Sequence, residues 1–107
     1  VANGQRLVTE LRDIRAGWEA RITARRGSTI YRVADLLVRR PVVNAVLLRD
    51  ELGISTGNAR RYVDPLVEAG ILLEFTDRSR NRAWRAPQVL DALDAFAERA
   101  GRRGWIG

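Results

Sequence analysis

Cysteine, histidine, lysine and methionine are all absent from this 107-residue sequence. Without cysteine, the chain has no disulfide framework, no thiol nucleophile and no thiolate zinc site. Without histidine, it also lacks the commonest general base and the commonest metal ligand. The usual catalytic triads and metal-hydrolase centres cannot be built from the residues that remain. We therefore predict that this chain is not itself an enzyme and has no catalytic residue, no metal site and no cofactor.

Long apolar runs are absent as well. No run approaches the roughly 18 residues that a membrane-spanning helix needs, and the N-terminus has no signal-peptide pattern. We expect a cytoplasmic protein with no membrane partner. Because the sequence begins at Val1 and contains no methionine, we also expect it to be part of a longer protein.

The charged residues give a formal net charge of +6, and all 19 basic residues are arginine. Arginine binds phosphates and carboxylates with two parallel hydrogen bonds, so this excess indicates an anionic partner. The excess is uneven, because residues 1–40 hold nine arginines against four acids whereas residues 41–107 hold ten against nine. An anion-binding face in the second part must therefore come from local clustering.

Residues 44–70 have the pattern of two helices joined by a sharp turn. Asn44 is placed to cap the first helix, which is apolar and stops at Gly53. One apolar residue, Ile54, then precedes Ser55, which can open a second helix running from Thr56. Such a three- to four-residue connection predicts a helix-turn-helix.

The second helix of this unit has two different faces. Its apolar stripe consists of Ala59, Val63 and Leu66, which we expect to be buried. Polar residues and a glycine occupy the opposite face: Thr56, Gly57, Arg60, Arg61 and Asp64. Pro65 removes one hydrogen bond from the helix interior, which predicts a kink or a split at Asp64.

Two short strands follow this unit. Gly70 can end the second helix, residues 71–75 are apolar except for Glu74, and a polar loop leads to a second strand over residues 82–86. The fold class predicted is mainly α: a winged helix-turn-helix with a small antiparallel β-hairpin as the wing and a long N-terminal helix. Its expected core is Leu48, Leu52, Ile54, Ala59, Val63, Leu66, Leu72 and Trp84.

The long N-terminal helix is predicted over Gln5–Arg26, about 33 Å at 1.5 Å per residue. Its apolar stripe consists of Leu7, Leu11, Ile14, Trp18 and Ile22. The stripe either covers the core of the domain or forms a docking or dimerisation seam, and the sequence leaves both open. We divide the chain into a linker helix (1–27), the winged helix-turn-helix (28–100) with a helix capped by Ser28, and a frayed basic tail (101–107).

Several motifs together resemble one known family. They are Arg40–Val43, Leu52–Ser55, Ala59–Tyr62, Leu66–Leu72, Arg80–Trp84 and Val89–Phe96. With them, the chain resembles the C-terminal winged-helix region of Fic-family proteins (filamentation induced by cAMP). In that family a separate helical core carries a histidine-containing loop, His-Pro-Phe-x-x-Gly-Asn-Gly-Arg, and transfers AMP to a hydroxyl of a target protein. That loop is absent here, so the resemblance implies an accessory domain of such an enzyme.

Two functions follow from this fold. The domain could bind duplex DNA through the outward face of the second helix and the wing. The residues predicted to do so are Thr56, Asn58, Arg60, Arg61, Arg78, Arg80, Asn81 and Arg82. Alternatively, it is a protein-interaction module that docks on the Fic catalytic core, on a target protein, or on a second protomer through the N-terminal helix. Arg49 at a helix-approach position and Gly57 on the outward face both weaken base-specific recognition.

Overall fold

The computed structural model describes residues 2–75 and 82–106, with side chains over 3–75 and 82–101. This part of the chain is mainly helical, with a small antiparallel sheet. Its elements in chain order are α1 (Ala2–Arg21), α2 (Thr29–Arg39), β1 (Val42–Asn44), α3 (Ala45–Leu52), the 3₁₀ helix η1 (Thr56–Asn58), α4 (Ala59–Glu68), β2 (Leu73–Glu74), β3 (Ala83–Arg85) and α5 (Pro87–Ile106).

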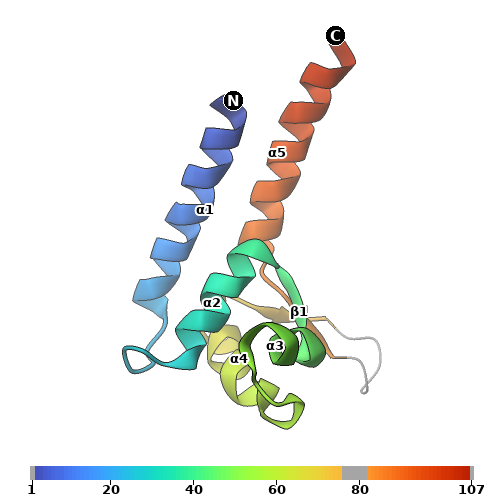
Figure 1. The fold of residues 1–107 in the computed structure, drawn as a ribbon. Helices are drawn as coiled ribbons and strands as arrows, with labels where there is room; N and C mark the ends of the chain where they lie inside the picture. The colour runs from blue at the N-terminus through green and yellow to red at the C-terminus, as the bar shows by residue number, and fades with distance from the viewer. Residues whose placement is uncertain (1, 76–81, 107) are drawn as a thin grey trace.

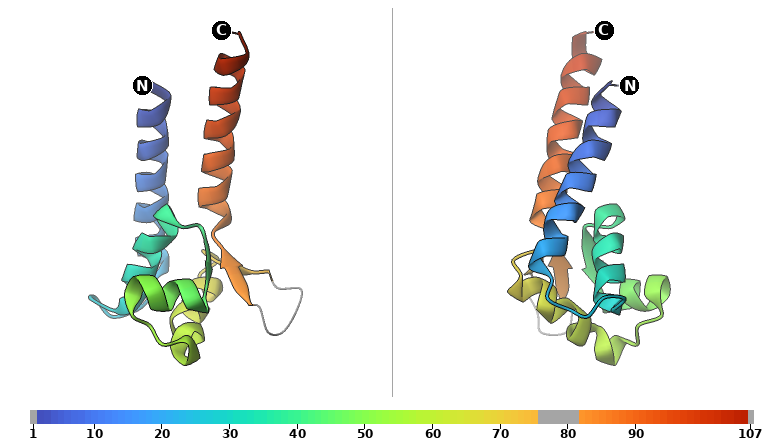
Figure 2. Two further views of the ribbon diagram at one scale, coloured as in Figure 1. Left: turned by 45° about the vertical axis from the view of Figure 1, so that its right-hand side comes forward. Right: turned by 90° about the vertical axis from the view of Figure 1, so that its left-hand side faces the viewer.

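The two long helices form an arm that projects from the remaining elements. α1 and α5 run side by side in opposite directions and the described ends of the chain lie at the free end of this arm (Figure 1, Figure 2). The molecule is therefore elongated, with extents of 49 × 33 × 22 Å. We call α1 and α5 the two-helix arm, and residues 29–75 with 82–85 the body.

The sheet has three antiparallel strands in the order β1-β3-β2. The predicted hairpin is present as β2 and β3, and β1 adds a third strand at the other edge of β3. Val43 lies opposite Trp84, and both side chains are buried. Because side chains alternate along a strand, their neighbours Val42 and Arg85 face away from the core.

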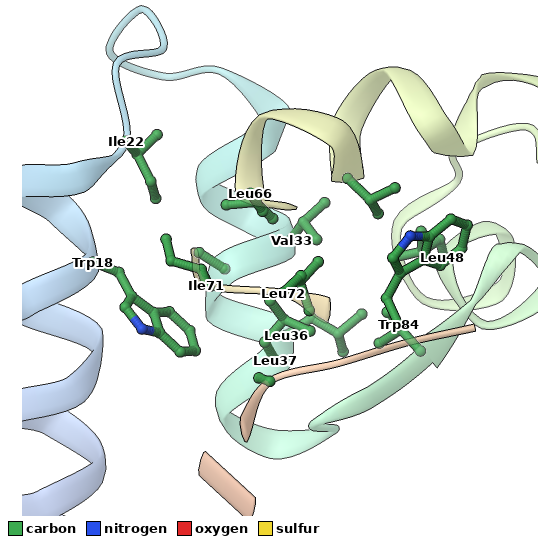
Figure 3. Close-up of a cluster of buried hydrophobic side chains, with 14 of the residues drawn as sticks. Trp18, Ile22, Val33, Leu36, Leu37, Leu48, Leu66, Ile71, Leu72 and Trp84 are labelled. Atoms are coloured by element: carbon green, nitrogen blue, oxygen red, sulfur yellow. The ribbon is translucent and has the colours of Figure 1, made fainter. Parts of the chain in front are cut away.

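The core lies between the inner face of the sheet and the helices. Figure 3 shows side chains from α1, α2, α3, α4 and β3 converging on it. The predicted core is confirmed, except that Leu52 is only partly buried at its margin. Leu48, Leu66 and Leu72 are completely buried.

Both long helices end elsewhere than predicted. α1 ends at Arg21 instead of Arg26. The reason is tertiary, because the chain turns there and Ile22 is buried in the core before the connection passes through Gly27, whose φ is 84°. α5 continues past Gly101, where we expected a frayed tail, as far as Ile106.

The apolar stripe of α1 is covered within this chain at its C-terminal end. Trp18 is 0% exposed, and its indole Nε1 donates a hydrogen bond of 2.8 Å to Oε1 of Gln88 in α5. Arg21 donates to the same oxygen at 3.3 Å. Leu11 and Ile14 pack against the core while remaining partly exposed. Of the two roles left open for the stripe, covering the core is therefore the one that Trp18 and Ile22 serve.

Leu66→Ala tests this packing. The substitution should lower the free energy of unfolding by about 2 to 5 kcal/mol, since it leaves a cavity at a fully buried site. Chemical denaturation followed by circular dichroism measures this change. Val46→Ala on α3 is the matched control, because Val46 is 49% exposed, and it should change stability by less than about 0.5 kcal/mol. A loss for Leu66→Ala as small as that of the control would contradict the assigned packing.

Candidate nucleic-acid interface

The first helix of the predicted unit, α3, is fixed at both ends as expected. At its start, Oδ1 of Asn44 accepts a hydrogen bond of 2.8 Å from the backbone N–H of Leu47. At its end, Gly53 adopts a left-handed conformation with φ 72°, and its N–H donates to the carbonyl of Arg49 at 2.9 Å. Glycine adopts this conformation without the steric cost that a Cβ imposes. The direction in which the chain leaves α3 is thereby set.

The connection to the next helix is short and anchored by one side chain. Ile54 is buried, whereas Ser55 is exposed. The Ser55 side chain makes no capping hydrogen bond, and its backbone carbonyl instead accepts from the N–H of Asn58 at 2.9 Å. The second helix therefore begins with the 3₁₀ turn of η1 and becomes α-helical only at Ala59, three residues later than predicted.

Helix α4 continues across Pro65, so the split predicted at Asp64 does not occur. Proline lacks the N–H that would reach the carbonyl of Arg61. The turn that begins at Pro65 is nevertheless closed, because the N–H of Ala69 donates to the Pro65 carbonyl at 3.0 Å. Complete burial of the neighbouring Leu66 holds this turn against the core.

The predicted contact residues of this helical segment are all exposed: Thr56, Asn58, Arg60 and Arg61. Nε of Arg60 lies 3.8 Å from Oδ1 of Asp64 one turn later, with side-chain exposures of 55% and 51%. The guanidinium of Arg61 lies 6.0 Å from the ring centre of Tyr62. Exposed ion pairs contribute about 0 to 1 kcal/mol, so the pair with Asp64 leaves Arg60 available to another anion.

The predicted wing contributes one described residue. Arg78, Arg80 and Asn81 lie outside the described residues. Arg82 lies just before β3, where its Nε is 3.8 Å from Oε2 of Glu74 on β2. The turn between α3 and α4 lies in the half of the molecule away from the described chain ends, and so do the strands β2 and β3 (Figure 1, Figure 2).

Acidic groups are interspersed with these arginines. On α3, Asp50 and Glu51 are exposed, and Nε of Arg49 lies 3.1 Å from Oδ1 of Asp50. Together with the pairs at Arg60 and Arg82, this gives a surface of mixed sign, as expected from the near-neutral composition of residues 41–107. Because positive and negative charges nearly balance on this surface, its overall electrostatic potential is weak. Any attraction of an anion therefore depends on where the individual arginines lie.

Sequence reasoning missed a second surface, the outer face of the sheet. We define it by Val42, Leu73, Phe75 and Arg85, together with Val46 of the adjoining α3. The four apolar residues in this set are between 42% and 49% exposed. The guanidinium of Arg85 lies 5.7 Å from the ring centre of Phe75. Period-two alternation around the buried Trp84 was the signal that could have indicated this face.

The described residues offer little to other kinds of site. Among residues 2–75 and 82–106, no group of three or more metal-ligating side chains is placed to hold an ion. No helix in the same ranges is long and apolar enough to cross a membrane. Comparisons of this chain with models of known protein families and with curated proteins find no match. The candidate interface therefore rests on its geometry and on its sequence motifs.

A pair of glycine substitutions tests the turn. Gly53→Ala should cost about 1 to 2 kcal/mol, because alanine is disfavoured in the left-handed conformation. Gly57→Ala is the matched control, since its φ is not positive and an added Cβ would meet no atom within 4 Å. It should be neutral or slightly stabilising. Thermal unfolding of the two variants compares them, and equal losses would show that the backbone of Gly53 does not constrain the turn.

Proposed function

We propose that this chain is a winged helix-turn-helix domain that binds duplex DNA. The observation that carries the proposal is the polar face on η1 and the first turns of α4. Its residues Thr56, Asn58, Arg60 and Arg61 are all exposed, while the opposite stripe of α4 is buried. A helix presented in this way can enter the major groove with its first residues at the base edges.

The residue types suit distinct roles in such a complex. Arginine can donate two hydrogen bonds to the edge of guanine. The asparagine amide can donate one hydrogen bond to N7 of adenine and accept one from its N6 amino group. We assign base contacts to Asn58 and Arg60, and phosphate contacts to Thr56 and Arg61. Arg78, Arg80, Asn81 and Arg82 of the wing would bind the neighbouring backbone, which fixes orientation but carries no sequence information.

The acidic neighbours shape this function as well. Arg60 would exchange its contact with Asp64, and Arg82 its contact with Glu74, for a contact with DNA. Both existing pairs are 3.8 Å long, and their side chains are between 35% and 55% exposed, so each exchange costs little. Asp64 would repel phosphate at the same time, which restricts productive binding to orientations in which Arg60 reaches the duplex.

From the motifs quoted above, we further propose that the chain is an accessory domain of a Fic-family protein. The AMP-transferring activity would then reside in a separate helical core that carries the His-Pro-Phe-x-x-Gly-Asn-Gly-Arg loop. This part of the proposal requires that loop elsewhere in the full protein. A full-length sequence without it would contradict the family assignment and leave the DNA-binding proposal unaffected.

The second candidate function is protein docking without DNA, and the observation that favours it is the outer face of the sheet. An exposed cluster of Val42, Val46, Leu73 and Phe75 is typical of an interaction surface. It lies on different elements from the polar face of η1 and α4. The two functions therefore predict that different variants impair binding.

Salt dependence tests the DNA proposal. Fluorescence anisotropy titration with a random-sequence duplex should give non-specific dissociation constants of about 10⁻⁴ to 10⁻⁶ M near physiological salt. With Arg61, Arg78, Arg80 and Arg82 contributing four phosphate contacts, the log–log slope against salt should be about −4. Replacing Arg80 and Arg82 by alanine should reduce that slope by about two units.

Two controls make this test selective. Arg6→Ala removes an exposed arginine of the two-helix arm and should leave the slope unchanged. Arg60→Ala should lose about 1 to 3 kcal/mol on a preferred site and little on other duplexes, if this residue contacts guanine. Absence of binding at low salt, or unchanged binding by the double wing variant, would contradict the DNA proposal and favour docking.

A further inference from the structure

A groove runs between α1 and the C-terminal part of α2, on a surface that the DNA proposal does not use. Its volume is about 580 Å³. Its floor is apolar and consists of Val8, Leu11 and Ala16 from α1 and Val38 from α2. Val8 is 48% exposed although it lies on a helix that packs elsewhere against the core. α1 and α2 are neighbours in both views of Figure 2.

The dimensions of this α1–α2 groove match those of a helix. Its lining residues on α1 run from Val8 to Glu19, all on one side of the helix. At 1.5 Å per residue this distance is about 16 Å, or three helical turns. An amphipathic helix that places its apolar stripe in such a groove is a common mode of peptide recognition.

The charged side chains around the groove fall into two sets, those that form ion pairs with each other and those that have no ion-pair partner among the described residues. Arg15 belongs to the first, with Nε 2.7 Å from Oδ1 of Asp35 and a second nitrogen 3.4 Å from Oε2 of Glu19. Burial lowers the pKa of Arg15, but its hydrogen bonds and charge interactions with these two acids outweigh that effect and raise the pKa above its ordinary value. Both acids that line the groove are thus engaged by one arginine.

Arg12 and Arg39 form the second set. Both line the groove, and both are exposed. Neither side chain makes an ion pair or a hydrogen bond with any residue that the structure describes. The apolar floor is therefore flanked by two guanidinium groups without a partner, one from each helix.

We propose that the α1–α2 groove binds an amphipathic helix of a partner protein, with apolar residues at three- and four-residue spacings and acidic residues on its flanks. The apolar stripe would cover Val8, Leu11, Ala16 and Val38, and the acids would pair with Arg12 and Arg39. DNA suits this groove poorly, because a phosphate backbone would bury the apolar floor without contacting it favourably. The site is independent of the DNA-binding function proposed above.

Binding of two matched synthetic peptides tests this proposal. The first is a helical peptide of about four turns with leucines on one stripe and glutamates on both flanks, and the second has lysines in place of the glutamates. Fluorescence anisotropy with the intact chain should show binding of the acidic peptide and at least about tenfold weaker binding of the basic one. The double variant Arg12→Glu/Arg39→Glu should reverse that preference.

The controls separate the groove from general charge effects. Arg25→Glu/Arg26→Glu changes the net charge equally at two exposed residues outside the groove lining, and it should keep the original preference. The groove variant should keep the DNA affinity of Arg25→Glu/Arg26→Glu within about twofold, because both carry the same net charge. Circular dichroism checks that each variant is folded.

Three results would overturn the proposal. One is the absence of binding of either peptide, and another is equal binding of both. The third concerns a second copy of this chain, whose α5 has exposed acids at Asp91 and Asp94. If sedimentation velocity shows self-association of the unmodified chain that the groove variant abolishes, the occupant is a second copy and not a partner protein.

Discussion

The left-handed backbone of Gly53 is the constraint on which the body depends. It stops α3 and turns the chain so that the next residue, Ile54, is buried. Helix α4 must then start at an angle that keeps Val63 and Leu66 in the core. The same angle leaves the residues of η1 and the first turn of α4 outside. One glycine conformation thus determines both the packed side and the exposed side of α4, and a Cβ at this position would strain both together.

Local ion pairing is the second determinant of what this surface can do. Arg60 and Arg82 each lie 3.8 Å from an acid of the same or the neighbouring element. Such pairs are weak and are screened by salt. They keep the arginine side chains near one position, but the arginines can still leave the pair to bind another anion. In the proposed function, affinity would be modest and would depend on how many arginines meet phosphates at once. Attachment to a longer protein with a second binding site would raise the effective affinity.

Much of the body could be predicted from the sequence because its signals are local. Asn44 as a cap, Gly53 as a stop and the stripe through Val63 all depend on neighbours within a few residues. The end of α1 could not be predicted, since it follows from burial of Ile22 by distant parts of the chain. Trp18 is likewise covered through Gln88 of α5, a contact between residues far apart in sequence.

The candidate site was predictable to a similar degree. Exposure of Arg60 and Arg61 followed from helical periodicity. The ion pair of Arg60 with Asp64 was not predicted, although their four-residue spacing on one helix is the signal that would have indicated it. The α1–α2 groove could not be predicted from the sequence, because it is formed by the packing of two separate helices against each other. Alternation around Trp84 could have indicated the exposed side of β3, but the place of Val42 on that side follows from the register of β1 against β3, which Val42 and Val43 alone do not specify.

The central claim, that the exposed face of η1 and α4 contacts DNA, is tested most directly by nuclear magnetic resonance. A titration of the ¹⁵N-labelled chain with a short duplex reports which backbone amides change their chemical shift. The account predicts that the largest changes occur at residues 56–61 and at the predicted wing contacts Arg78, Arg80, Asn81 and Arg82, with small changes along α1 and α5. Changes centred on the α1–α2 groove or on the outer face of the sheet, or no changes at low salt, would contradict it.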